Sequence, residues 1–409
     1  DKGNGEWAYM ITSRSKVNTL FASGNSEFYV GKKWLFSADI ALHQHFAKNQ
    51  DRNIITQQGD KAVVGYDKAR TELSAYMTAK WTPTERLGLS LALREDMYGK
   101  DWTPLIPAFY ADWFFDRLEK GYSVWTNPFN GVKSYISYAR TRLIVFWSKN
   151  PRPLLPHLGK LREKGIRCYL HYTLNDYEAE GLERGVPPLD ERIETFLRFS
   201  ELLGKELVIW RFDPLVLTER TGVEELLRKA ERIGDRLRGH TEKLVFSFAD
   251  IRAYRNVESR LRRNALPCRE FDERQMLGMA AGLAELNEKW NYTLAACGER
   301  IDLSQFGVRR NKCIDDELIV RKFSDDPLLT DFLGVSREGL PGAGTAVRKS
   351  LKDKGQRPFC GCVASKDIGE YDTCPHGCAY CYANRSGEKA SENYRLHRAR
   401  PTAETITGK

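Results

Sequence analysis

Hydrophobic and polar positions alternate with a period of two through much of the first quarter of the chain. Apolar side chains occupy every second position from Leu73 to Trp81 and again from Leu87 to Leu93, and a short polar turn at residues 82–85 separates the two runs. The stretch from Trp34 to Leu42 repeats the pattern. Alternation of this length, joined by a short turn, predicts antiparallel strands with one apolar face.

From about Ile106 the pattern changes to short, continuous apolar runs that alternate with stretches of helical periodicity. Such a pattern predicts a parallel sheet covered by helices, and the number of repeats favours a (β/α) barrel, complete or partial, over an open doubly wound sheet. We therefore expect a β-rich segment over residues 1–105 and an α/β domain over residues 106–409. The predicted strands are Leu143–Trp147, Cys168–Thr173, Leu207–Arg211, Leu244–Phe248 and Tyr292–Ala296, with helices around residues 154–161, Glu194–Leu203, Gly222–Leu237 and Glu273–Trp290.

Composition is that of an ordinary soluble protein, with 41% hydrophobic and 29% charged residues among 409. No window is apolar enough for a membrane-spanning helix, and no signal peptide is visible. The chain begins at Asp1 rather than at a methionine, which is typical of a fragment. The net charge of +9 fits a solvated Lys/Arg surface. It leaves an anionic substrate or a nucleic acid open, although no aromatic–basic binding stripe accompanies it.

The nine cysteines are concentrated late in the chain: none precedes Cys168, and five lie between Cys360 and Cys381. Clustering in a long chain indicates metal ligation in a reducing compartment rather than a disulfide framework. Cys374, Cys378 and Cys381 form a Cys-x₃-Cys-x₂-Cys cluster of three thiols that leaves a gap for a fourth ligand. A structural zinc ion usually has four protein ligands, whereas a [4Fe–4S] cluster bound by three cysteines leaves one iron open for S-adenosylmethionine (SAM). The alternative is a zinc site that Cys360 or Cys362 completes.

Four other cysteines, Cys297, Cys313, Cys360 and Cys362, are candidates for an auxiliary site that holds zinc or a second cluster. Cys168 and Cys268 have no partner at a suggestive spacing and are expected to be structural. The sequence has no glycine-rich phosphate-binding loop.

Polar residues recur where the predicted strands end, which is where barrel enzymes place their chemistry. Arg211 and Asp213 are two positions apart, so both side chains should point to one side of the strand. We expect these two residues and Glu299 to contact SAM or a substrate. Further strand-end candidates are Lys149, Asn150, His171, Asn175 and Asp250, and His376 lies inside the cysteine loop.

Several segments carry a family resemblance: Ile106–Trp113, Thr126–Asn130, Phe146–Pro153, and Cys360–Cys362 through Ala383. They resemble an uncharacterised bacterial family, domain of unknown function 1848, whose C-terminal cysteines are similar to the cluster of radical SAM enzymes. Residues Cys374–Asn384 also resemble the corresponding loop of spore-photoproduct-lyase-like radical SAM proteins.

The resemblance implies a cytoplasmic radical SAM enzyme with a partial or complete barrel and an unknown substrate. Cys374, Cys378 and Cys381 would bind a [4Fe–4S] cluster, and a reductant such as flavodoxin or ferredoxin would drive cleavage of SAM to a 5′-deoxyadenosyl radical. By the same resemblance Tyr380 would lie beside the adenine of SAM, although an aromatic that packs beneath the loop is an equal alternative. The competing class is a non-enzymatic module in which zinc fixes the C-terminal loop.

Residues Thr71–Pro107 resemble strands of TonB-dependent outer-membrane receptors, with Trp34, Trp81, Tyr98 and Trp102 as candidate interfacial aromatics. Members of the uncharacterised family typically begin with a strand and an Arg-Arg-Thr-Asp-type turn, and Asp101–Leu105 stand in that place here. A junction near residue 105 would explain both observations, either as a gene fusion or as an assembly error. An outer-membrane segment and a cytoplasmic cluster belong on opposite sides of the inner membrane, which favours the error.

Overall fold

The computed structural model describes six strands between Ser15 and Met97, and then residues 107–126, 133–335, 351–353 and 359–409. Two compact units make up the chain, Asp1–Asp101 and Trp102–Lys409. The predicted aromatic positions Tyr98 and Trp102 and the junction at residue 105 lie outside the described residues.

The first unit contains a four-stranded sheet in the order β1-β2-β5-β6. Every neighbouring pair in this sheet is antiparallel, and the pairing of β5 with β6 has a register irregularity between Trp81 and Thr84, at the end of β5. The antiparallel strands that the alternation predicts are therefore confirmed, although each extends further than expected. The strands of this unit are β1 (Ser15–Val30), β2 (Trp34–Asn49), β3 (Ile54–Ile55), β4 (Lys61–Ala62), β5 (Asp67–Thr84) and β6 (Leu87–Met97).

The second unit is built on a six-stranded sheet in the order β16-β15-β13-β11-β10-β9, so its strands lie side by side in chain order. All neighbouring pairs are parallel, which places every carboxyl end at the same edge. The α/β class with a parallel sheet is confirmed. In the part of the chain that the structure describes, β9 and β16 are edge strands, and no closed barrel is seen. The strands are β9 (Leu143–Ser148), β10 (Arg167–Thr173), β11 (Val208–Leu215), β13 (Lys243–Phe248), β15 (Thr293–Ala296) and β16 (Arg309–Arg310).

Alternate residues of these strands enter two separate apolar cores, as side chains of successive strand residues point to opposite faces. On one face Leu170, Trp210 and Phe246 pack with the helices that connect the strands. On the other face Tyr169, Ile209 and Val245 pack with two later helices and with Cys362. The first core is covered by α4 (Leu189–Leu203), α5 (Val223–Leu237) and α7 (Glu273–Trp290), and the second by α8 (Asp316–Phe323) and α9 (Pro327–Phe332).

The predicted strands are confirmed to within one or two residues except β11, which continues past Arg211 to Leu215 through a register irregularity. The predicted helix Glu273–Trp290 is confirmed at both ends. A capping box between Asp272 and Gln275 begins it, and the left-handed backbone of Asn291 ends it.

Two helix predictions need correction. Helix α4 begins at Leu189 rather than Glu194, because Pro188 precedes it and acidic residues fill its first turn. The helix expected over residues 154–161 is divided into a 3₁₀ segment, η1 (Arg152–His157), and α3 (Leu158–Glu163), because Pro156 lies inside it and cannot donate a backbone hydrogen bond.

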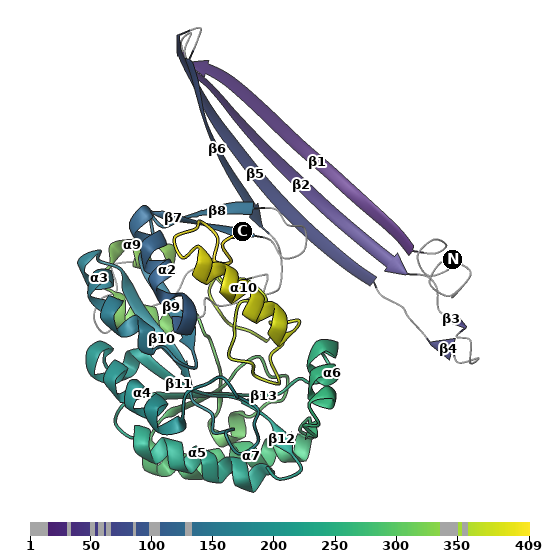
Figure 1. Cartoon of the computed structure of the whole chain (residues 1–409), viewed down its shortest axis with the longest axis vertical. Coiled ribbons are helices and arrows are strands. Elements are labelled where there is room, and N and C mark those ends of the chain that lie inside the picture. Colours follow the sequence, from purple (N-terminus) through teal and green to yellow (C-terminus); the bar gives the residue numbers. More distant parts are fainter. Residues whose placement is uncertain are drawn as a thin grey trace. The chain divides into compact units, whose positions relative to one another are not determined.

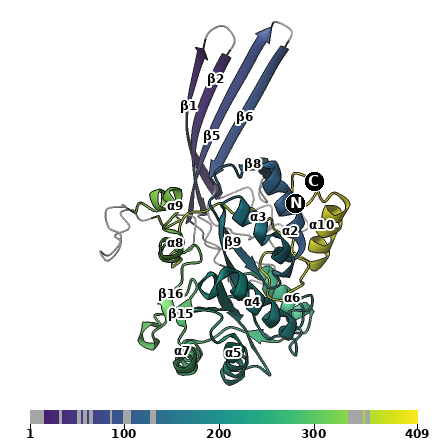
Figure 2. The ribbon, with the colours of Figure 1, turned by 90° about the vertical axis from the view of Figure 1, so that its left-hand side faces the viewer.

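The carboxyl-terminal segment packs beside the start of the second unit. Helix α10 (Gly387–Ala399) lies beside α2 (Pro107–Lys120) in both ribbon views (Figures 1 and 2), and the rings of Tyr110 and His397 meet at 4.7 Å. The sequence analysis did not predict either helix. The remaining elements are β7 (Tyr122–Thr126), β8 (Lys133–Ser137), β12 (Leu217–Thr218), α6 (Arg255–Arg263), β14 (Cys268–Arg269), η2 (Lys205–Leu207) and η3 (Ser304–Phe306).

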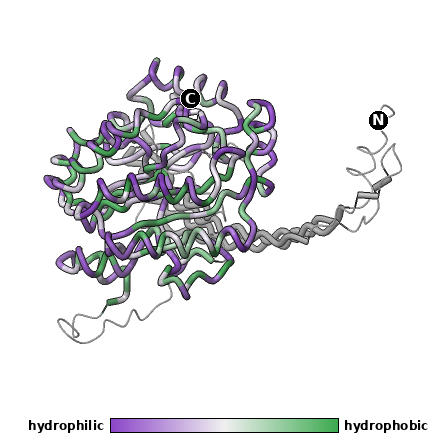
Figure 3. The backbone as a smooth tube through the Cα atoms, turned by 90° about the horizontal axis from the view of Figure 1, so that it is seen from below, coloured by the Kyte–Doolittle hydropathy of each residue, from purple (hydrophilic) through white to green (hydrophobic). Residues whose placement is uncertain are grey.

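The hydropathy of the helices agrees with this packing. Hydrophilic (purple) and hydrophobic (green) positions alternate along the helices of the second unit rather than forming long blocks (Figure 3). None of the helices in the described part of the chain is both long and apolar enough to cross a membrane.

Candidate functional site

The loop that carries Cys374, Cys378 and Cys381 is closed by its own hydrogen bonds. The amide nitrogen of Asp372 donates to the carbonyl of Ala383 at 3.1 Å, and the Asn384 side chain donates to the carbonyl of Cys374 at 2.6 Å. The amide of Cys381 donates to the carbonyl of Cys378 at 3.2 Å. The loop, which we call the cysteine loop (residues 372–384), therefore has a defined backbone in which the three thiols are held on one short segment.

Other elements hold the cysteine loop at the carboxyl edge of the parallel sheet. Arg260 of α6 donates to the carbonyl of Cys381 at 2.6 Å, and Tyr110 of α2 donates to the carbonyl of Thr373 at 2.6 Å. Two backbone hydrogen bonds of 2.8 Å join the loop to residues 182–185, one from Ala379 to Leu182 and one from Gly185 to His376. This docking surrounds the loop on several sides, so its backbone is held before any cofactor binds.

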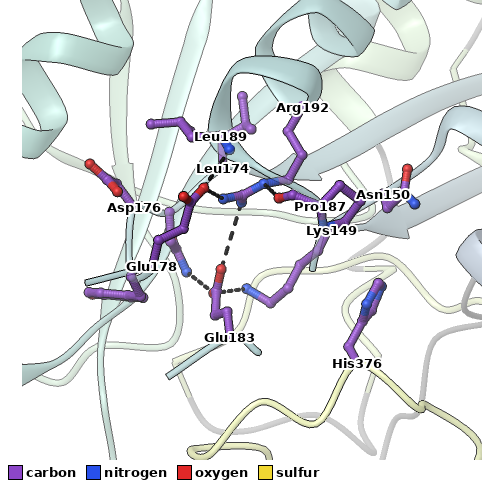
Figure 4. Close-up of polar contacts among 12 residues, drawn as sticks. Lys149, Asn150, Leu174, Asp176, Glu178, Glu183, Pro187, Leu189, Arg192 and His376 are labelled. Atoms are coloured by element: carbon purple, nitrogen blue, oxygen red, sulfur yellow. Dashed lines mark hydrogen bonds and ion pairs between the residues drawn. The ribbon is translucent and has the colours of Figure 1, made fainter. Parts of the chain in front are cut away.

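A buried charge network lies directly beside the loop. Glu183 is buried and receives the Lys149 ammonium at 2.7 Å, while the guanidinium of Arg192 lies 3.7 Å from its other oxygen. Figure 4 shows Lys149 and Arg192 pointing at Glu183. Asn175 donates to the same carboxylate at 3.0 Å, and the hydroxyl of Tyr380 donates to it as well. Lys149 and Asn175 follow β9 and β10, so the network joins two strand ends to the cysteine loop.

Burial and the charges of this network shift the pKa values of Glu183 and of two cysteines in the loop. Burial alone would raise the pKa of Glu183, but Lys149 and Arg192 outweigh it and hold that pKa at about 2. Burial raises the pKa of Cys374 to about 12, and the charge of Cys381 adds to this effect. Burial also raises the pKa of Cys378, which Lys149 opposes. The ammonium therefore lies close enough to favour the thiolate forms of two of the loop cysteines, which are the forms that bind metal.

Gly185 provides a test of how tightly the loop is docked. A Cβ at this position would lie 2.6 Å from the carbonyl oxygen of His376, which is shorter than any ordinary contact. We expect Gly185→Ala to displace the loop and to lower the free energy of unfolding by about 1–3 kcal/mol, measured by urea denaturation. Gly159→Ala is the matched control, because Gly159 lies in α3 with nothing within 4 Å of an added Cβ. Equal stabilities of the two variants would contradict the docking described here.

Glu370, just before the loop, has a carboxyl group that accepts the amide of Thr126 at 3.0 Å. Burial raises its pKa to about 7. Because the unfolded chain loses this proton near pH 4.3, the contribution of Glu370 to stability falls as the pH rises from there to about 7. Glu370→Gln should therefore match the wild type at pH 4 and exceed its unfolding free energy at pH 8 by up to about 3 kcal/mol. Denaturation at both pH values measures this, and a difference independent of pH would contradict it.

The four residues predicted to contact SAM do not all lie in one place. Tyr380 is buried in the charge network, with Lys149 5.4 Å from its ring centroid. Arg211 and Asp213 do share one side of β11, and the Arg211 Nε–Asp213 Oδ2 distance is 3.0 Å. The Arg211 guanidinium also lies 3.2 Å from the sulfur of Cys313. Arg211 and Asp213 thus lie beside Cys313 of the auxiliary set.

Glu299, the fourth of these residues, accepts the amide of Phe248 at 2.9 Å. Burial raises its pKa to about 7. It lines an open pocket of about 550 Å³ together with Arg310 and Phe359.

The four candidate auxiliary cysteines come together in the structure. The sulfurs of Cys297 and Cys313 are 3.6 Å apart, and the amide of Cys313 donates to the sulfur of Cys362 at 3.1 Å. The side chain of Cys360 interacts with that of Cys362. Cys360 and Cys362 therefore join Cys297 and Cys313, and their interactions are with this group rather than with the cysteine loop. Among the residues that the structure describes, no three His, Cys, Asp or Glu side chains already surround one point as metal ligands.

Glu183, Arg192 and Arg260 were not predicted from the sequence. No local signal marks them: Glu183 lies in a polar connection, and both arginines lie on helices rich in charged residues. Their roles become visible only when the connection after β10 and helices α4 and α6 meet the cysteine loop. Of the other strand-end candidates, His171 is buried with its Nε2 at 2.9 Å from the carbonyl of Cys313.

Fold and site together define a parallel α/β domain that carries two groups of cysteines, one on a docked loop and one on the other face of the sheet. Residues 104–383 match the family described as a domain of unknown function (DUF1848), and the chain belongs to that family. A search of the curated proteins found no match.

Proposed function

We propose that the second unit is a radical SAM enzyme domain in which Cys374, Cys378 and Cys381 hold a [4Fe–4S] cluster. The observation that carries the proposal is the docked cysteine loop: three thiols on one closed loop lie at the carboxyl edge of a parallel sheet, beside the Lys149 ammonium. The six strands in chain order support the further proposal that the sheet is a partial barrel of the radical SAM type.

In this proposal Cys374, Cys378 and Cys381 would hold the cluster as thiolates, and an iron without a cysteine ligand would be left for SAM. When bound, the reduced cluster supplies the electron that cleaves SAM to methionine and a 5′-deoxyadenosyl radical. The residues of the chain hold the cysteine loop in place and offset its charge. Lys149 offsets the negative charge of the thiolates, and Arg260 and Tyr110 hold the backbone of the loop.

Three buried polar atoms beside the loop are candidates for contacts with SAM. Glu183 Oε2, Arg192 Nη1 and His376 Nε2 have no hydrogen-bond partner among the described residues. Glu183 Oε2 and Arg192 Nη1 form an ion pair at 3.7 Å, which is too long for a hydrogen bond. Buried polar groups normally have hydrogen-bond partners, so these atoms are expected to receive a ligand or water. The charges of Glu183 and Arg192 reach His376, whose pKa burial lowers to about 4. Because Nδ1 of His376 donates to the carbonyl of Gly185 at 2.8 Å, the Nε2 atom of the neutral imidazole accepts a hydrogen bond and does not donate one.

Anaerobic reconstitution of the full chain with iron and sulfide tests the proposal. A brown protein with a broad charge-transfer absorbance at roughly 400 nm is expected. A chain that stays colourless after reconstitution, whatever zinc it contains, would overturn the assignment of the cysteine loop to a cluster.

For residues 1–105 we propose a fragment of an outer-membrane receptor joined at a junction near residue 105. Four long antiparallel strands that neighbour one another in chain order support it. Independent genomic reads across the codons near residue 105 test the junction. An uninterrupted reading frame in all of them would contradict an assembly error and leave a gene fusion.

A further inference from the structure

Three separate segments bring Cys297, Cys313, Cys360 and Cys362 to one place, which we call the four-thiol group. Cys297 follows β15 and Cys313 follows β16, so both lie at the carboxyl edge of the sheet. Cys360 and Cys362 belong to a later segment that reaches the second apolar core. The sulfurs of Cys297 and Cys313 are 3.6 Å apart, and the amide of Cys313 donates to the sulfur of Cys362 at 3.1 Å, so these contacts bring the two segments together.

The backbone at these positions is fixed by hydrogen bonds. The amide of Cys297 donates to Phe246 of β13 at 2.9 Å, and the amide of Val363 donates to Ile314 at 3.0 Å. Gly361 separates the last two cysteines, and a Cβ there would lie 3.1 Å from the Lys312 side chain. The segment of Cys360 and Cys362 is therefore packed closely against the chain on either side of Cys313, and this closeness is a property of the fold.

Nitrogen donors surround the sulfurs. Arg211 and Asn311 each place a nitrogen 3.2 Å from the sulfur of Cys313, and the amide of Cys313 lies 3.1 Å from the sulfur of Cys362. Both Arg211 and Asn311 are buried. Such donors stabilise metal-bound thiolates and fix their orientation. A buried guanidinium also offsets part of the negative charge that four thiolates would bring to the site.

We propose that the four-thiol group binds a single zinc ion in a tetrahedral site. Zinc–sulfur bonds of about 2.3 Å place the sulfurs of a tetrahedral site roughly 3.8 Å apart, close to the Cys297–Cys313 distance of 3.6 Å. The sulfur of Cys362 lies beside the amide of Cys313, and rotation about the Cα–Cβ bonds of the four cysteines would bring their sulfurs around the ion. On binding, the thiols release their protons to solvent, so that zinc and four thiolates form a site of net charge −2.

Other occupants fit the geometry less well. In a [4Fe–4S] cluster each cysteine binds a different iron. The cysteine sulfurs around a cluster therefore lie further apart than cysteine sulfurs that bind a single ion. A disulfide between Cys297 and Cys313 needs a sulfur–sulfur distance of about 2.0 Å and leaves Cys360 and Cys362 without a role. The zinc ion would tie the segment 359–363 to the ends of β15 and β16 and thereby fix Phe359 at the pocket that Glu299 and Arg310 line.

The test uses the full chain with Cys374→Ala, Cys378→Ala and Cys381→Ala, so that the cysteine loop cannot bind iron. After removal of metal with a chelator, Co²⁺ alone is titrated and then displaced by Zn²⁺. We expect one cobalt per chain with the intense visible spectrum of a tetrahedral thiolate site, and a thermal midpoint that rises with zinc. Because the proposed cluster is absent from this variant, the result does not depend on the proposed enzymatic function.

Cys360→Ser in the same background should lower the affinity for cobalt by roughly 100-fold or more. Cys360 is partly exposed, so we expect the variant to keep its fold, and circular dichroism without metal checks this. Cys268→Ser is the matched control, since this half-buried cysteine belongs to neither group. Three results would each overturn the proposal: no stoichiometric cobalt binding, unchanged binding in Cys360→Ser, or an iron–sulfur cluster retained by the triple variant.

Discussion

Replacing Cys378 with alanine is expected to abolish iron–sulfur cluster binding while leaving the fold of the second unit intact. Cys378 is buried at the centre of the cysteine loop, and the charges of Cys374 and Cys381 both act on its thiol. Two thiolates cannot hold a cluster that needs three, so iron per chain should fall from about four to below about one. The broad absorbance of the reconstituted protein should disappear with it, and cleavage of SAM should fall by more than about 100-fold.

Cys268→Ala is the control for Cys378→Ala, since Cys268 is a half-buried thiol that belongs to neither cysteine group. It should retain the cluster and the absorbance. Zinc bound by the four-thiol group should be unchanged in both variants, which separates a local loss of ligands from general unfolding. Full iron content in Cys378→Ala would contradict the assignment of the cysteine loop.

Replacing Glu183 with glutamine is expected to lower the free energy of unfolding by about 3–5 kcal/mol, because removal of one partner leaves buried charges unpaired. Lys149 and Arg192 both face this carboxylate, and Arg192 is only 1% exposed. The variant also weakens the anchor of Tyr380. Urea denaturation measures the loss, and iron content after reconstitution reports whether the cysteine loop has moved.

Glu201→Gln is the matched control for Glu183→Gln. Glu201 pairs with Arg198 at 2.8 Å on α4, and both side chains are well exposed. Exposed pairs of this kind contribute about 0.3–0.5 kcal/mol. A loss of the same small size in Glu183→Gln would show that the buried network does not hold the strand ends and the cysteine loop together.

The strands of the parallel sheet were predictable because both of their faces are covered, which makes them continuous apolar runs such as Leu244–Phe248. Helix α7 was predictable at both ends because its caps are local signals. Helix α10 was not predicted, since its apolar contacts are with distant α2. Closure of the sheet into a barrel, which the repeat count favoured, is not seen among the described residues.

The residues of the candidate sites also include some that the sequence could predict and some that it could not. The seven cysteines of the cysteine loop and the four-thiol group were predictable, because cysteines at such spacings are rare. The sequence left open, however, whether Cys360 or Cys362 completes a zinc site at the cysteine loop. Their contact with Cys313 depends on the packing of two segments far apart in the sequence. Glu183 carries no sequence signal at all, because an acid in a polar connection is ordinarily solvated.

Cleavage of SAM by the reconstituted chain tests the central claim most directly. The full chain, reconstituted anaerobically with iron and sulfide and reduced with dithionite, is incubated with SAM, and 5′-deoxyadenosine is measured by mass spectrometry. We expect its formation even without a substrate, and its absence in Cys378→Ala treated in the same way. A protein that holds the cluster at the cysteine loop, binds SAM and yet forms no 5′-deoxyadenosine would contradict the proposed function.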